Sequence, residues 1–163
     1  MKQLIIAAIS LGMLSACGSS KKASGYELPS RDDVKGNWQV TDIKLGAAAN
    51  GEKLAFTLLN EGPKDCLIGS TWYFPNNGKG YYTINANGAG CKPGEKSIVW
   101  SYRKESGKAI FQYKLMEAGM QAHQIGDGYK FTILSAGDNT MELESTIQYQ
   151  GSPIAITYTF TKS

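Results

Sequence analysis

The sequence predicts an all-β fold, an eight-stranded antiparallel up-and-down barrel with one short helix. From residue 37 onward, apolar and polar residues mostly alternate, which is the pattern of antiparallel strands with one buried face. Turn sequences rich in Gly, Asn and Ser separate the alternating segments. Eight strands joined by tight turns suit a closed barrel, which leaves no sheet edge exposed. A two-sheet sandwich is the competing architecture.

The expected strands succeed one another along the chain with short connections in most places. Each is rich in β-branched or aromatic residues, and the later ones have one apolar and one polar face. The turns are signalled at residues 76–78, 106–107, 137–139 and 150–153. We expect the strands at residues 37–43, 71–74, 80–84, 98–103, 109–115, 129–133, 141–149 and 154–161.

Two segments depart from the alternation. Glu52–Asn60 places leucine and alanine side chains at helical spacing, and Gly62-Pro63 would end a helix there, so this is the expected short helix. Met116–Gly128 is long for a hairpin connection and rich in Gly, Ala, Met and Gln. Loops of this length often form lids or the mouths of binding sites, although some are simply mobile.

The N-terminal sequence predicts an export signal. A basic start and an apolar stretch over residues 4–14 are too short for a permanent membrane helix and are typical of a secretory signal. Leu14-Ser15-Ala16-Cys17 resembles the bacterial lipoprotein signal. That resemblance implies removal of residues 1–16 and acylation of Cys17, for example by palmitate, which would anchor the protein to a membrane. The alternative is an ordinary secreted protein with an incidental cysteine.

Residues 17–32 have little to bury, so we interpret them as the acylated cysteine and a flexible tether, followed by one barrel domain at 33–163. Gly18 follows Cys17, whereas an acidic residue there would retain a lipoprotein at the inner membrane in the better-studied sorting system. The resemblance therefore implies an outer-membrane anchor facing the periplasm, with display at the cell surface as the alternative.

The charge balance argues against a nucleic-acid partner. Without Lys2 the 17 basic side chains become 16, against 14 acidic ones, and the lysines are scattered. The mature chain keeps 147 of the 163 residues, enough for one core, and we expect a monomer.

The remaining cysteines, Cys66 and Cys91, predict a disulfide, because exported chains meet an oxidising environment. His123 is the sole histidine, and no metal-ligand spacing accompanies it, so we expect neither a metal nor another cofactor. No nucleophile with a neighbouring base is recognisable, and the sequence does not indicate an enzyme.

A family resemblance agrees with the strand count. Gly36-Asn37-Trp38 resembles the Gly-x-Trp signature near the start of lipocalins. Residues 70–74, 77–80, 100–102, 129–135 and 156–160, with the two cysteines in order, resemble the lipocalin-like domain of Bacteroides-type lipoproteins. The similarity covers about residues 33–162, with departures at Tyr73 and Lys79, where threonine is common. It implies a lipocalin-like barrel and an apolar ligand, without identifying that ligand.

Aromatic residues on the strands are the main functional lead. They either line a cavity for a small apolar ligand, in the barrel or at its mouth, or simply fill a barrel that has little spare room. In the second case the protein would be a structural or interaction lipoprotein, with the turns at 76–79 and 87–94 contacting an envelope protein or glycan. The candidate lining residues are Trp38, Trp72, Trp100, Tyr102, Phe111, Tyr113, Phe131 and Tyr158, with Phe160 in the same phase and Trp38 expected to plug the closed end.

Overall fold

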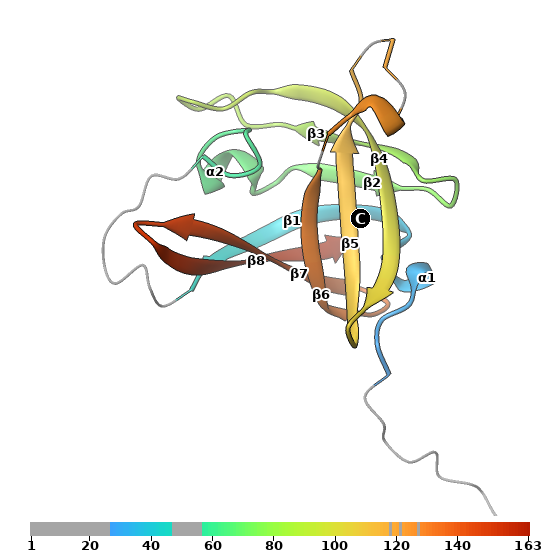
Figure 1. Ribbon diagram of the computed structural model, residues 1–163. Helices are drawn as coiled ribbons and strands as arrows, with labels where there is room; N and C mark the ends of the chain where they lie inside the picture. Colours follow the sequence, from blue (N-terminus) through green and yellow to red (C-terminus); the bar gives the residue numbers. More distant parts are fainter. Residues whose placement is uncertain (1–26, 47–56, 118, 121, 127) are drawn as a thin grey trace, which may run out of the picture.

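The computed structural model describes residues 27–46, 57–117, 119–120, 122–126 and 128–163. Eight antiparallel strands close into a barrel in sequence order, as the sequence predicts (Figure 1). The expected acylation site at Cys17 lies outside the described residues. The elements are α1 (Arg31–Val34), β1 (Gly36–Leu45), α2 (Lys64–Leu67), β2 (Thr71–Phe74), β3 (Lys79–Ile84), β4 (Gly94–Glu105), β5 (Lys108–Leu115), η1 (Ala122–Gln124), β6 (Tyr129–Ala136), β7 (Thr140–Tyr149) and β8 (Ser152–Lys162).

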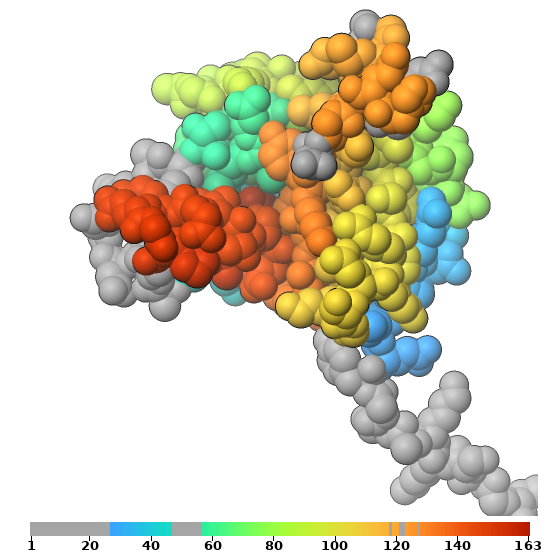
Figure 2. All heavy atoms as spheres, viewed as in Figure 1, coloured from blue at the N-terminus to red at the C-terminus, as the bar shows by residue number. Residues whose placement is uncertain are grey.

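Pairing of the first and last strands closes the sheet. β1 pairs with β8 from Trp38↔Lys162 to Leu45↔Ile156, and with β2 on its other edge. A two-residue turn joins β4 to β5, with Ser106 at φ 50° and Gly107 at φ 74°. Positive φ at both positions gives the twist that a tight hairpin needs, and glycine adopts it without steric cost. The β7–β8 hairpin, red in Figure 2, extends well beyond the neighbouring surface.

Aromatic rings fill the centre of the barrel. The Trp72 ring stacks on Tyr82 with the centroids 4.2 Å apart, and meets Tyr113 and Phe160 edge-on at 5.4 and 5.9 Å. All four side chains are buried. Offset and edge-on arrangements are the ones that aromatic quadrupoles favour, so the rings pack without leaving a central channel.

Residues 57–67, which precede β2 in the sequence, cover one end of the barrel, and we call this segment the plug. We call this end the open end, because the cleft described below opens beside the plug. The predicted helix at Glu52–Asn60 is wrong for Thr57–Asn60, which form an isolated bridge and a turn; residues 52–56 lie outside the described part of the chain. Leu59 and Asn60 have φ values of 51° and 59°, which reverse the chain and end any right-handed helix. The short helix comes instead after Pro63, as α2.

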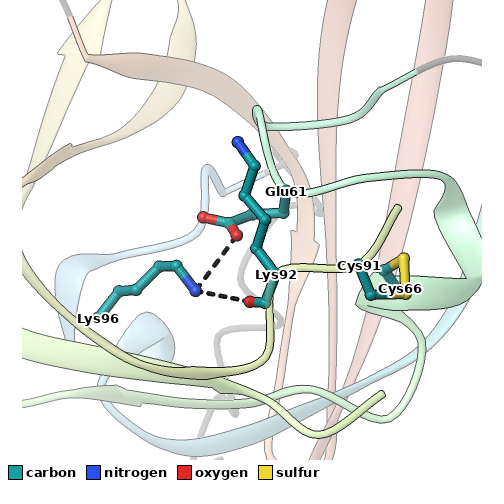
Figure 3. Close-up of a disulfide and its surroundings, with 5 residues drawn as sticks. All are labelled: Glu61, Cys66, Cys91, Lys92 and Lys96. Carbon is teal, nitrogen blue, oxygen red and sulfur yellow. Dashed lines mark hydrogen bonds and ion pairs between the residues drawn. A yellow bond between two sulfur atoms is a disulfide. The ribbon is translucent and has the colours of Figure 1, made fainter. Parts of the chain in front are cut away.

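The Cys66–Cys91 disulfide is confirmed, and it ties α2 to the β3–β4 connection (Figure 3). The two Cα atoms are 5.3 Å apart, within the range that a disulfide spans. Gly62 packs against this bridge at φ 139°. A Cβ atom at Gly62 would lie 2.8 Å from Cys66 Sγ and 2.6 Å from the Gly90 carbonyl oxygen, so only glycine fits there.

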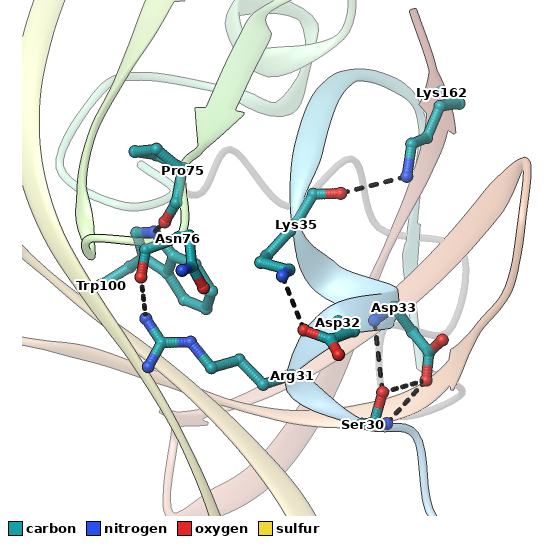
Figure 4. Close-up of polar contacts among 9 residues, drawn as sticks. All are labelled: Ser30, Arg31, Asp32, Asp33, Lys35, Pro75, Asn76, Trp100 and Lys162. Atoms are coloured by element: carbon teal, nitrogen blue, oxygen red, sulfur yellow. Dashed lines mark hydrogen bonds and ion pairs between the residues drawn. The ribbon is translucent and has the colours of Figure 1, made fainter.

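The opposite, closed end is covered by α1 (Figure 4). Ser30 and Asp33 form a reciprocal capping box that starts this short helix. Trp38 Nε1 donates to the Val34 carbonyl at 2.8 Å, and Trp38 is fully buried at this end, where it was expected. The Arg31 guanidinium lies 4.7 Å from the Trp100 ring centroid. The folded body therefore includes α1 and begins before the expected boundary at residue 33.

None of the helices in the described residues is long and apolar enough to cross a bilayer.

We predict that the disulfide stabilises the fold by about 3.5 kcal/mol, because it closes a loop of 25 residues in the unfolded chain. Cys66→Ser should lower the free energy of unfolding, measured by urea titration, by roughly that amount. Labelling of unreduced, denatured wild-type barrel should leave both cysteines unmodified, and full labelling of both would contradict the pairing.

Candidate binding site at the open end of the barrel

The interior of the barrel holds a void of only about 10 Å³. A void of this size is close to the minimum for one water molecule. Five of the predicted lining residues surround it, whereas Trp38, Trp100 and Tyr102 lie toward the closed end and do not line it. The five are Trp72, Phe111, Tyr113, Phe131 and Tyr158.

Tyr102 has a different role from the one predicted. Its side chain is half-buried, and its hydroxyl donates to the Pro29 carbonyl at 2.7 Å. The residue therefore helps to fix the segment before α1 on the barrel.

A much larger hollow, about 610 Å³, opens between β6, β7 and the plug. The β6–β7 ladder runs only from Ala136↔Met141 to Thr132↔Glu144. Beyond it, residues 129–131 of β6 pair with β5, and residues 145–149 of β7 pair with β8. A register shift between Ile133 and Ser135 marks a bulge, which bends a strand and increases its twist. The two strands diverge here, and we call the resulting hollow the cleft.

The lining of the cleft combines apolar and polar residues. Its apolar surface comes from both the plug and the strands, and the tyrosine rings add apolar faces with a hydroxyl at one end. The Lys130 ammonium forms an ion pair with Glu105 at 3.1 Å, so its charge is already paired within the protein. The lining residues are Thr57, Leu58, Leu59, Asn60, Gly128, Tyr129, Lys130, Phe131, Ser145, Thr146, Ile147 and Tyr158.

Three side chains separate the cleft from the interior void. Leu59, Phe131 and Tyr158 line both spaces, so each forms part of the wall between them. Phe131 and Tyr158 were predicted from the strand alternation, whereas Leu59 comes from the plug. The wall therefore combines two strand residues with one turn residue.

A buried polar cluster of Glu61, Tyr82 and Lys96 connects the plug to β3 and β4. Glu61 is only 2% exposed, accepts a hydrogen bond from the Tyr82 hydroxyl and forms an ion pair with Lys96 at 3.3 Å (Figure 3). Lys96 also donates to the Lys92 carbonyl at 2.8 Å. Burial of a carboxylate is costly unless its oxygens are paired. The plug is consequently held where these partners meet.

The buried tyrosines keep their protons at neutral pH. Burial raises the pKa of Tyr82 and Tyr113 well above the usual range, and it raises the pKa of Tyr158 to about 12. Each therefore presents a neutral hydroxyl. Tyr82 uses its hydroxyl in the bond to Glu61, while the Tyr113 hydroxyl has no partner among the described protein groups.

The described residues contain no group of three or more His, Cys, Asp or Glu side chains arranged to hold a metal ion. His123 lies exposed on η1. The residues that line the cleft present apolar surface and hydrogen-bonding groups.

Comparison of the chain with protein-family models, curated proteins and solved structures found no match.

The alternation over residues 129–133 and 141–149 predicted strands with one apolar face, but it carried no sign of the point at which β6 and β7 diverge. Leu58, Leu59 and Asn60 were assigned to a helix, so their place in the cleft was missed. The one available signal was Gly62-Pro63, which marks a chain reversal just after them.

We predict opposite results for two tyrosine-to-phenylalanine substitutions. Tyr82→Phe should lower the free energy of unfolding by about 1–3 kcal/mol, because it leaves a buried Glu61 oxygen without its donor. Tyr113→Phe should be neutral or stabilising, because it removes a buried hydroxyl that has no protein partner. Urea unfolding of both variants checks this, and equal losses would contradict it.

Proposed function

We propose that the chain is an exported, lipid-anchored barrel protein that binds a small amphipathic molecule in the cleft. The observation that carries this proposal is the contrast between a cleft of about 610 Å³ and an interior void of about 10 Å³. Pockets of 300–1,000 Å³ with apolar walls and a few polar groups are typical small-molecule sites. The binding site is thus at the mouth of the barrel.

The lining favours a ligand with an apolar body and a polar edge. Leu58 and Ile147 present aliphatic surface, and Tyr129 and Phe131 present aromatic surface. Asn60, Ser145 and Thr146 can donate or accept hydrogen bonds, whereas the Lys130 ammonium is paired with Glu105. A neutral polar group on the ligand fits this set. The lipocalin-like resemblance of residues 33–162 supports the same class of function.

The export part of the proposal rests on residues 1–17 and is consistent with the disulfide. Disulfides persist in oxidising compartments, and Cys66–Cys91 is such a bond. A lipid on Cys17 would attach the chain to the membrane, with an outer-membrane anchor facing the periplasm as the location we propose and surface display as the alternative. Binding, with no chemical step, is the activity proposed.

A second candidate is an interaction lipoprotein whose barrel is a rigid platform. The filled interior favours it, because such a core serves stability without a ligand. The turns at 76–79 and 87–94 would then contact an envelope protein or glycan. Crosslinking in intact envelopes discriminates, because a protein with no stable neighbour there would count against this candidate.

We predict that Ile147→Trp weakens binding in the cleft by at least about tenfold, because the larger ring occupies ligand space. The measurement is fluorescence titration of the purified, mature-length protein with N-phenyl-1-naphthylamine, together with native mass spectrometry for a copurifying molecule. Ser101→Trp, on the exposed face of β4, is the matched control and should bind as the wild type does. Equal affinity in all three proteins, with no copurifying molecule, would overturn the cleft as the binding site.

We predict that Cys17→Ala moves the protein from the membrane to the soluble fraction, because a thiol is required for the lipid. Fractionation of cells by centrifugation, followed by immunoblotting, measures this, and Ser19→Ala is the control that should stay membrane-bound. Release of both variants, or of neither, would contradict the proposal that a lipid on Cys17 anchors the protein. Protease treatment of intact cells then separates the two locations, since rapid loss of the barrel indicates surface display.

A further inference from the structure

We propose that the Leu59 side chain is a displaceable gate between the cleft and the barrel interior, and that the ligand carries a flat apolar ring that takes its place. This inference rests on the proposed binding function and names the part of the ligand that reaches deepest. Leu59, Phe131 and Tyr158 form the wall common to both spaces. Of these three side chains, Leu59 is the one that can move.

The two aromatic members of the wall are fixed by the sheet. Phe131 pairs with Phe111 on β5, and Tyr158 pairs with both Ile43 and Leu143. The Phe131 and Tyr158 rings meet edge-on with their centroids 5.5 Å apart. Both side chains are buried, and moving either would disturb strand pairing and ring contacts. Phe131 and Tyr158 are therefore the fixed members of the wall between the cleft and the void.

Leu59 differs in its backbone, which is held in an unfavourable conformation. Its φ of 51° is left-handed, a region that is strained for a non-glycine residue. Glycine would adopt it without that strain, so the surroundings of Leu59 must hold the conformation. Strained residues of this kind cluster at ligand sites, where the surroundings impose the conformation.

The turn itself is fixed, so a movement of Leu59 is a movement of its side chain. Leu58 N donates to the Gly62 carbonyl at 2.7 Å, and Glu61 N donates to the Leu58 carbonyl at 2.8 Å. Lys92 Nζ adds a bond of 2.6 Å to the Asn60 carbonyl. The leucine is only half-buried, and rotamer changes of such side chains need no backbone rearrangement.

The volume behind Leu59 explains why the ligand must displace it. An apolar cavity of about 150 Å³ is needed to admit a ring as small as benzene. The void behind Leu59 has about 10 Å³, so the interior is closed while the leucine points inward. A ring that enters from the cleft would take the place of the Leu59 side chain against Trp72 and Phe111, which line the void. The apolar area that the ring buries would replace the area that the leucine buries, so little hydrophobic stabilisation is lost.

The test compares Leu59→Ala and Leu59→Gly with wild type in the N-phenyl-1-naphthylamine titration on the mature-length protein. Both variants should bind at least about fivefold more tightly, and the bound probe should emit at shorter wavelength because it sits deeper and drier. Leu59→Gly also removes the backbone strain, so it remains informative where the alanine variant folds poorly. Leu28→Ala is the matched control: this leucine is also half-buried, but it lies at the closed end and should bind as wild type does.

Unchanged affinity and emission in both Leu59 variants would overturn the gate. That result is distinguishable from failure of the cleft itself, because Ile147→Trp reports on the cleft without involving Leu59. A gain shared by Leu28→Ala would also overturn the gate, since general loosening of the barrel would then explain the tighter binding.

Discussion

The limited internal volume of an eight-stranded barrel is the constraint on which the rest of this structure depends. Such a barrel is only just wide enough for its own side chains. Here large rings occupy that space, with Trp72 stacked on Tyr82 and in edge contact with Tyr113 and Phe160. The same aromatic residues that suggest a ligand cavity in the sequence therefore stabilise a solid core. The cleft, which has room for another molecule, lies outside this core, where β6 and β7 diverge.

The core and the plug are joined by hydrogen bonds as well as by packing. Trp72 Nε1 donates to Ser70 Oγ at 2.9 Å, and Ser70 Oγ donates to the Leu67 carbonyl at 2.6 Å, all in buried positions. The central ring is thereby connected directly to the end of α2. Glu61 makes the second connection through Tyr82, whose ring is the stacking partner of Trp72. The plug is thus positioned by the core that it covers, which explains how a segment with little regular structure presents defined side chains to the cleft.

Strand alternation and turn sequences were sufficient to predict the strands, because inward positions are mostly apolar and the period is set by the backbone. They favoured the barrel but left a two-sheet sandwich open, since closure depends on the long-range pairing of β1 with β8. All eight expected strands are present, with ends that shift by a few residues, such as Gly94 in place of Ile98 at the start of β4. The plug could not be predicted in the same way. Leu58 and Leu59 have helical spacing relative to their neighbours, but left-handed φ at Leu59 and Asn60 is imposed by tertiary contacts. The burial of Glu61 likewise depends on Tyr82 and Lys96, which are paired across β3 and β4 and lie well beyond Glu61 in the sequence.

The start of the described chain and the cleft lie at opposite ends of the barrel. The described chain enters at the closed end, where Tyr102 holds the Pro29 carbonyl and Arg31 packs over Trp100. The plug, the disulfide and the cleft are all at the open end. Under the proposed acylation of Cys17, the anchor would join the folded body at the closed end, and the proposed binding site lies at the opposite end. The anchor and the ligand would therefore not compete for the same surface of the barrel.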